Sequence, residues 1–203
     1  MKPGWIAPNR TAVMVIDCQV DFGAPDGAMA RRGADMTAPQ AALAKAVGLV
    51  DAARGAGVKI IFVRLLTRGE SRIAREARLR RGGDEPDLCV EGSRGADFAG
   101  PQPQAGDRIV SKTRFSAFAR TGLADQLHAQ GVDTLVLAGL TTECCVASSA
   151  WDGLEHDFHI FIAEDACGAY DQDLHRHALK ALALSGATVA TSREFAENWK
   201  KSI

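Results

Sequence analysis

Residues 134–154 constrain the fold of this chain more than any other stretch. An apolar run at residues 135–138 is too short for a buried helix, and it is followed by Gly139, two threonines and residues that suit a helix. This pattern predicts a strand, a tight turn and a helix. Cys145 would lie in the first helical turn, where unpaired N–H groups and the helix dipole favour an anion. We therefore expect the pKa of this thiol to be lowered.

Length and composition suit a single domain over residues 1–203. The chain has 203 residues, of which 46% are hydrophobic, so it can bury a sizeable core. Its formal net charge of -1 gives no footprint for nucleic acid or for an anionic membrane surface. No run approaches the roughly 18 apolar residues of a membrane span, and the N-terminus lacks a signal-peptide core. We expect a cytoplasmic protein that acts on a small molecule.

The cysteines favour neither disulfides nor a zinc site. They are odd in number, include an adjacent pair and lack CxxC spacing. We expect reduced thiols at all five positions, which are Cys18, Cys89, Cys144, Cys145 and Cys167.

Strands and helices alternate along most of the chain. Strands are predicted at residues 11–17, 58–63, 107–111, 135–138, 158–163 and 187–190. Helices are predicted at residues 39–54, 123–130, 173–185 and 193–200, and in the segment whose first turn contains Cys145. This order implies an α/β fold with a doubly wound, Rossmann-like six-stranded parallel sheet and helices on both faces. No GxGxxG follows the first strand, so we expect no nicotinamide cofactor.

Residues 64–106 interrupt this alternation. They are rich in Arg, Gly, Pro and Asp, and a stretch of this length without regular structure often forms a lid or a binding loop. Residues 70–81 are predicted to form a short basic helix within it.

Three predicted strand ends carry chemically useful side chains, Asp17, Lys112 and Cys145. Parallel strands end at one edge of a sheet, so these side chains should meet there. A carboxylate, a cation and a thiol supply the base, the positive charge and the nucleophile of covalent acyl transfer. Each also has an ordinary structural interpretation: a helix cap, a solvated lysine and a small buried hydrophobe. The residue types alone leave both interpretations open.

Three motifs resemble those of the isochorismatase-like cysteine hydrolases. They are VIDCQVDF at 15–22, KTRFSAF at 112–118 and GLTTECCV at 139–146, in the order typical of that superfamily. Its members include nicotinamidases and N-carbamoylsarcosine, ureidoacrylate and biuret hydrolases. The resemblance implies that Asp17 is the base, Lys112 its electrostatic partner and Cys145 the nucleophile, because Cys145 rather than Cys144 precedes the motif's valine. It also suggests a homo-oligomer.

The resemblance further implies a cis peptide between Leu140 and Thr141. The backbone amides of Thr141 and Cys145 would then form an oxyanion hole. Asp17 would take the thiol proton, the thiolate would attack an amide carbonyl, and water would hydrolyse the resulting thioester. We expect a small amide, ureido or carbamoyl compound as substrate.

The chain departs from the metal-dependent nicotinamidases after its second predicted strand. Those enzymes carry an Asp-x-His motif there, whereas residues 64–69 (RLLTRG) contain no histidine. We therefore expect no bound metal. The alternatives are a vinyl-ether hydrolase of the isochorismatase type, a nicotinamidase, and a catalytically idle binding protein. Surface positions are predicted for the histidines, which are His128, His156, His159, His175 and His177.

Several other residues have two interpretations. Gln19, Phe22, Phe115 and Trp151 could line a substrate pocket, although aromatic residues near a core more often pack within it. Asp21 could orient the loop after the first strand or stabilise a turn. A run of arginines favours a solvated face or a subunit contact, but one of them could bind a substrate carboxylate. The run comprises Arg64, Arg68, Arg72, Arg75, Arg78, Arg80 and Arg81.

Overall fold

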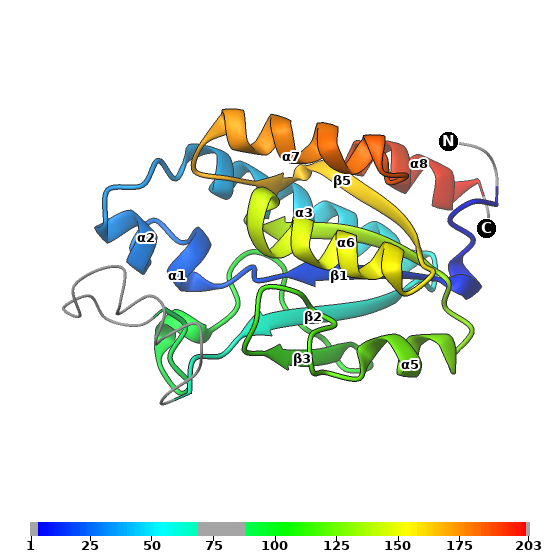
Figure 1. The fold of residues 1–203 in the computed structure, drawn as a ribbon, viewed down its shortest axis with the longest axis horizontal. Helices are drawn as coiled ribbons and strands as arrows, with labels where there is room; N and C mark the ends of the chain where they lie inside the picture. Colours follow the sequence, from blue (N-terminus) through cyan, green and yellow to red (C-terminus); the bar gives the residue numbers. More distant parts are fainter. Residues whose placement is uncertain (1–3, 69–87, 202–203) are drawn as a thin grey trace.

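The computed structural model of the chain describes residues 4–68 and 88–201. Its six strands form one parallel sheet in the order β3-β2-β1-β4-β5-β6 (Figure 1). The strands are β1 (Thr11–Ile16), β2 (Lys59–Leu65), β3 (Arg108–Lys112), β4 (Thr134–Leu140), β5 (His159–Gly168) and β6 (Thr188–Ala190). The predicted doubly wound sheet is confirmed. The strand order reverses between β1 and β4, and ligands of open α/β sheets bind at such a switch point.

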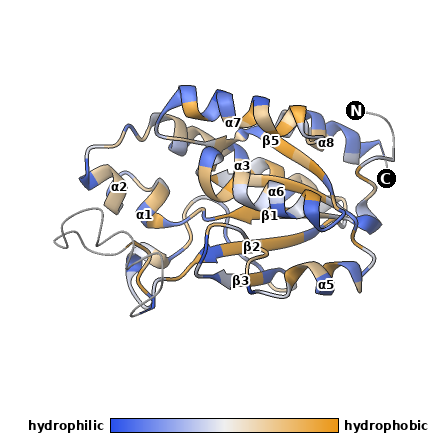
Figure 2. Ribbon diagram, in the orientation of Figure 1, coloured by the Kyte–Doolittle hydropathy of each residue, from blue (hydrophilic) through white to orange (hydrophobic). Residues whose placement is uncertain are grey.

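Helices cover both faces of the sheet, and each face has its own apolar core. Helices α3 (Thr37–Gly55) and α8 (Ser192–Lys200) pack on one face. On the other face lie α5 (Leu123–His128), α6 (Ala147–Glu155) and α7 (Gln172–Leu184). Figure 2 shows the strands largely in apolar colours between helices whose outer sides are polar. No helix among residues 4–68 and 88–201 combines the length and the apolar character that a membrane crossing requires.

The central strands explain the continuous apolar runs in the sequence. Every residue of β1 and of β4 is buried, because helices cover both faces of a parallel sheet. In Figure 1 the arrowheads of the strands point to the same side of the molecule. We call this side the carboxyl edge and the opposite side the amino edge.

The sequence did not predict four short helical turns. Two follow β1 at the carboxyl edge, α1 (Val20–Gly23) and α2 (Ala28–Arg31). The others are the 3-10 turns η1 (Pro8–Arg10) and η2 (Arg94–Ala96). Turns of three or four residues are too short to show a helical period, so a pattern-based reading misses them. The predicted helix at 70–81 lies outside the described residues.

The turn after β4 corrects one prediction. Residues Thr142–Val146 form a π-helical turn, η3, and the α-helix begins only at Ala147. The Val146 N–H donates to the Thr141 carbonyl over 3.2 Å, five residues back. Apolar spacing cannot distinguish a π turn from an α turn, because the same residue types suit both. Single π turns are frequent at functional sites.

Candidate active site

The predicted triad residues all lie at the carboxyl edge. Asp17 follows β1, Lys112 is the last residue of β3, and Cys145 lies in η3 after β4. Because Ile16 pairs with Gly139, the ends of β1 and β4 lie side by side. The backbone turns sharply at Asp17, where φ is 50°, and a short acidic side chain tolerates this left-handed conformation better than most.

The three side chains meet through the lysine. The Lys112 ammonium donates to Asp17 Oδ2 over 2.6 Å and to Cys145 Sγ over 3.4 Å. Its third contact is the Arg114 carbonyl oxygen at 3.0 Å. Lys112 reaches across β2, which separates its own strand from β1. The prediction that these three residues come together is confirmed.

This charged pair is fully buried. The side chains of Lys112 and Asp17 are each 0% exposed, and burying an ion costs several kcal/mol. Burial raises the pKa of Asp17, although the positive charge of Lys112 opposes the shift. Burial alone would lower the pKa of Lys112, but the interactions of its ammonium with Asp17 and Cys145 outweigh burial, so the pKa is raised. Asp17 Oδ1 is buried and has no hydrogen-bond partner within the described part of the chain.

The Cys145 thiol behaves differently from our expectation. A hydrogen bond with the Cys144 thiol, burial, and the nearby Asp17 carboxylate raise the pKa of Cys145 well above its ordinary value. The same hydrogen bond lowers the pKa of Cys144, which is only half-buried. The predicted lowering at Cys145 is therefore wrong, because desolvation at this depth opposes the charged form. At rest the thiol is protonated, so it needs a base before it can act as a nucleophile.

The turn that carries Cys145 is tightly constrained at its start. The peptide between Leu140 and Thr141 is cis, as the resemblance implied. Gly139 has a φ of +135°, and a Cβ atom there would lie 1.9 Å from the Ile16 carbonyl oxygen. No larger residue fits without moving the backbone. The Thr141 carbonyl accepts hydrogen bonds from Cys144 and Val146, which closes η3.

The buried side chain of Gln19 connects the end of β2 with the η2 turn. Its side-chain oxygen accepts from the Leu65 N–H over 2.8 Å, and its amide nitrogen donates to the carbonyls of Leu65 and Ala96 at 2.9 and 3.0 Å. Both ends of the amide are thus used by the backbone. Contact of Gln19 with a substrate stays a prediction.

Asp21 orients two loops beside the site. Its carboxylate accepts from the N–H groups of Ala28 and Cys89 over 3.1 and 2.8 Å. The backbone of Gly95 approaches so closely that a Cβ atom there would lie 2.1 Å from Asp21 Oδ2. Of its two interpretations, the structure favours orienting the loop.

The predicted aromatic pocket residues lie in different environments. Phe22 is half-buried, and its carbonyl accepts a hydrogen bond of 2.8 Å from the Tyr170 hydroxyl. Phe115 and Trp151 are 48% and 40% exposed, so these two do not pack within the core. A role for the three as pocket walls stays a prediction.

One histidine contradicts the surface interpretation. His175 on α7 is half-buried, and its Nδ1 lies 2.8 Å from Oγ1 of Thr142, a fully buried residue of η3. The other four histidines are exposed, as predicted. Nothing in the local sequence marks His175, because its partner lies 33 residues earlier in the chain.

Two arginines of the basic run fall within the described residues. Arg64 donates to the Ser111 hydroxyl over 3.1 Å and lies 5.9 Å from the centre of the Phe98 ring. Arg68 forms an ion pair of 2.7 Å with Glu91. The remaining members lie outside the described residues: Arg72, Arg75, Arg78, Arg80 and Arg81.

Among residues 4–68 and 88–201, no cluster of three or more His, Cys, Asp or Glu side chains could hold a metal ion. The five cysteines are free thiols.

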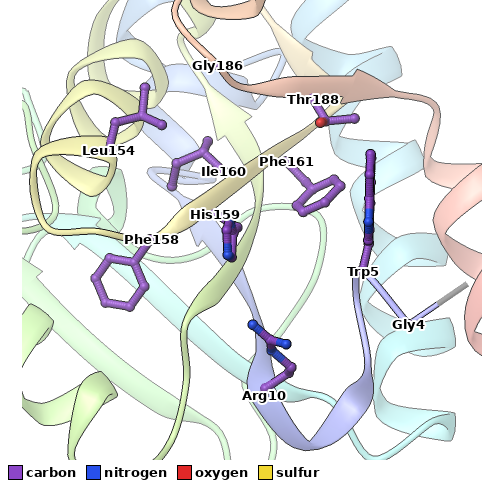
Figure 3. A pocket seen from close by; sticks show the side chains of 10 residues that line it. All are labelled: Gly4, Trp5, Arg10, Leu154, Phe158, His159, Ile160, Phe161, Gly186 and Thr188. Carbon is purple, nitrogen blue, oxygen red and sulfur yellow. The ribbon is translucent and has the colours of Figure 1, made fainter. Parts of the chain in front are cut away.

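A cavity of about 360 Å³ lies at the amino edge (Figure 3), and its lining does not include the triad residues. In the figure, Trp5 and Phe161 form one side and Arg10 and His159 another. Arg10 is already paired with Asp133. The lining comprises Gly4, Trp5, Arg10, Leu154, Phe158, His159, Ile160, Phe161, Gly186 and Thr188.

Comparison with known proteins gives consistent results. The model of the isochorismatase domain family matches residues 11–194. The maleamate amidohydrolase of Pseudomonas putida is 34% identical over 170 residues, covering 82% of this chain and 76% of the relative. The ureidoacrylate amidohydrolase of Methylobacterium radiotolerans is 30% identical over 195 residues, covering 88% and 75%.

Solved structures show the same fold. An isochorismatase family protein from Desulfovibrio vulgaris superposes with a TM-score of 0.81 at 28% identity, covering 93% of this chain and 97% of that one. The nicotinamidase of Bacillus subtilis superposes with a TM-score of 0.76 at 27% identity, covering 89% and 99%.

Proposed function

The chain belongs to the isochorismatase family, and from this premise we propose that it is an amidohydrolase that cleaves a small amide, ureido or carbamoyl C–N bond through a thioester on Cys145. The contact of buried Lys112 with both Asp17 and Cys145 carries the proposal. Relatives named as maleamate and ureidoacrylate amidohydrolases support the substrate class.

The reaction begins with the protonated thiol. Asp17 takes the proton from Cys145 Sγ, and its buried Oδ1, which has no hydrogen-bond partner among residues 4–68 and 88–201, is the oxygen available to accept it. Lys112 stabilises the thiolate from 3.4 Å and keeps Asp17 in place from 2.6 Å. The raised pKa of the Cys145 thiol means that it becomes a strong nucleophile only when this transfer occurs.

Bond formation and cleavage follow in the same place. The thiolate attacks the carbonyl carbon, and the N–H groups of Thr141 and Cys145 stabilise the oxyanion of the tetrahedral intermediate. The C–N bond then breaks as the proton on Asp17 passes to the leaving nitrogen. Asp17 next deprotonates a water molecule that attacks the thioester, which releases the acid and restores the thiol. Apart from the attacking water, the groups that move protons and hold the oxyanion in these steps belong to the chain itself.

The remaining expectations belong to this proposal. Residues 1–203 act as one domain, supported by a single sheet that takes strands from Thr11 to Ala190. A homo-oligomer is supported by the exposed aromatic residues Phe115 and Trp151, since subunit contacts commonly cover such side chains. A cytoplasmic location is supported by the five free thiols.

Ammonia release from a panel of substrates tests the proposal. The panel comprises maleamate, ureidoacrylate, an N-carbamoyl amino acid and nicotinamide, and intact mass is followed for an acylated enzyme. Cys145→Ala should abolish release, whereas Cys144→Ala should preserve it. Equal release by wild type and Cys145→Ala would refute the thioester mechanism. A chelator should leave activity undiminished.

The same assay separates the alternatives. Release from nicotinamide alone would favour a nicotinamidase. A protein that is silent on all amides but consumes isochorismate would favour vinyl-ether hydrolysis. One that binds a panel member without converting it would favour the idle binding role.

A further inference from the structure

We propose that His175 is a positioning residue for the active-site turn η3 and that it acts through Thr142. Thr142 is fully buried, and its Oγ1 lies 2.8 Å from His175 Nδ1 on α7. Thr142 stands between the two residues whose amides we assign to the oxyanion hole, Thr141 and Cys145. The inference rests on the proposed function, because this turn governs turnover only if those amides hold the oxyanion.

The turn needs support from outside itself. A π turn is rarer and less favourable than an α turn, so its geometry depends on surrounding contacts. Within η3 the Thr141 carbonyl already accepts from both Cys144 and Val146. These bonds define the shape of the turn but do not attach it to the rest of the protein. The bond from Thr142 to His175 joins it to a separate helix, 33 residues away along the chain.

The neighbouring Thr141–Glu143 bond is different in kind. The Thr141 hydroxyl donates to Glu143 Oε1 over 2.9 Å, a contact between residues two apart. It lies wholly within the turn region and cannot fix the position of η3 relative to another element. His175 therefore provides a long-range constraint on Thr142, beside the contacts that Lys112 and Ser149 make with Cys145.

The protonation state of His175 suits this task. Burial lowers the pKa of His175; the negative charge of Glu143 opposes the shift and Arg176 adds to it. The ring is therefore neutral near pH 7. With its hydrogen on Nε2, a neutral ring accepts the Thr142 hydroxyl hydrogen at Nδ1. An amide oxygen could do the same, which makes asparagine a conservative replacement.

The same helix offers a matched control. His177 lies two residues later, is exposed, and its Nδ1 lies 2.7 Å from the Asp173 carbonyl oxygen of its own helix. It thus shares the residue type, the helix and the hydrogen-bonding nitrogen with His175, but its hydrogen bond stays within its own helix and does not reach η3.

Steady-state kinetics on the best amide of the panel test the proposal. His175→Leu should lower kcat by about 10- to 100-fold with KM changed by less than about 3-fold, because a displaced oxyanion hole weakens the transition state more than substrate binding. His175→Asn should retain kcat within about 5-fold, and His177→Leu should match wild type. Wild-type kcat in His175→Leu, or a His175→Asn variant as slow as His175→Leu, would overturn the inference.

Substitutions of Thr142 test the same contact without His175→Leu if that variant folds poorly, and a double-mutant cycle measures the coupling of the two residues. Thr142→Val removes the hydroxyl with little change of volume, and Thr142→Ser keeps it. The Val variant should lose kcat as His175→Leu does, the Ser variant should not, and the double variant Thr142→Val/His175→Leu should be no slower than either single one. Fully multiplicative losses would show that the two residues act independently and would contradict the proposal.

Alkylation of Cys145 by iodoacetamide requires no substrate and separates the two proposals. Tandem mass spectrometry distinguishes Cys145 from Cys144. A loosened turn should expose the thiol, which is 6% exposed in the structure, so His175→Leu should be alkylated at Cys145 at least about 5-fold faster than His177→Leu. A wild type inactive on every amide would refute the proposed function, and equal alkylation rates would refute the positioning role.

Discussion

The two edges of the sheet each carry an ion pair that involves β1, but the two pairs are built in opposite ways. Arg10 and Asp133 precede β1 and β4 at the amino edge, and their side chains are 41% and 40% exposed. At the carboxyl edge, Asp17 follows β1 and pairs with Lys112, and both side chains are fully buried. An exposed pair contributes at most about 1 kcal/mol, whereas a buried pair often costs stability relative to apolar residues. The buried pair is therefore better explained by chemistry than by stability.

The pKa values of the two aspartates shift in opposite directions. Burial raises the pKa of Asp17 despite Lys112. Partial burial alone would also raise the pKa of Asp133, but the hydrogen bonds from Arg10 and Thr134 outweigh burial, so this pKa is lowered. A raised carboxyl pKa weakens the folded state as pH rises through it, and a lowered one stabilises the folded state until pH falls through it. The ionised Asp133 carboxylate at the amino edge therefore stabilises the folded state. The ionised Asp17 carboxylate at the carboxyl edge does not.

The largest expected effect on activity comes from replacing an aspartate by asparagine at the carboxyl edge, and the same replacement at the amino edge serves as its control. Asp17→Asn removes the proposed base and should lower kcat/KM by at least about 1000-fold. Asp133→Asn should leave kcat/KM within about 2-fold, because it lies at the far end of the strands. Kinetics on the best amide substrate measure both. Comparable losses of kcat/KM in the two variants would show that the carboxyl edge is not the catalytic one.

Two glycines with positive φ extend the comparison to the backbone. Gly139→Ala at the carboxyl edge would place Cβ 1.9 Å from the Ile16 carbonyl, so unfolding free energy should fall by about 4 kcal/mol or more. Gly186→Ala at the amino edge would meet no atom of the described residues within 4 Å. At a φ of +111° the backbone conformation opposes the substitution, at about 1–2 kcal/mol. Urea unfolding of both variants gives the difference. A Gly139 variant as stable as the Gly186 variant would refute the close approach.

The buried ion pair of Lys112 and Asp17 can be tested by replacing one partner or both. Lys112→Met leaves the Asp17 carboxylate buried without a counter-charge and should reduce unfolding free energy by about 3 kcal/mol at pH 7. Protonation of Asp17 relieves that charge, so the loss should shrink as pH falls. The double variant Lys112→Met/Asp17→Asn removes both charges and keeps a side chain that tolerates the left-handed backbone, so it should recover much of the stability while remaining inactive. Urea unfolding at several pH values measures these changes in unfolding free energy. A Lys112→Met variant as stable as wild type would contradict the full burial of the pair.

The smallest effect is expected at the exposed pair. Arg10→Met should reduce unfolding free energy by less than about 1 kcal/mol at pH 7, with no change in kcat/KM. The loss should disappear as pH falls through the lowered pKa of Asp133, since a protonated carboxyl group no longer pairs with Arg10. Added salt should weaken the effect as well. A loss above about 2 kcal/mol would mean that the amino edge also depends on its ion pair.

The sequence by itself determined the parallel six-stranded sheet and the alternation of strands and helices along the chain, whereas the order of the strands within the sheet came from the structure. Continuous apolar runs report burial on both faces, and the ends of parallel strands must share an edge, so the meeting of Asp17, Lys112 and Cys145 followed from their places in the chain. The family motifs added the cis peptide after Leu140, which the structure contains.

Only the tertiary structure decided how that edge is built. The raised pKa of the Cys145 thiol follows from burial and from the Cys144 and Asp17 groups around it, and the anchoring of Thr142 follows from the approach of α7. Desolvation and hydrogen bonds between distant residues depend on distances through space, which local spacing in a sequence does not record.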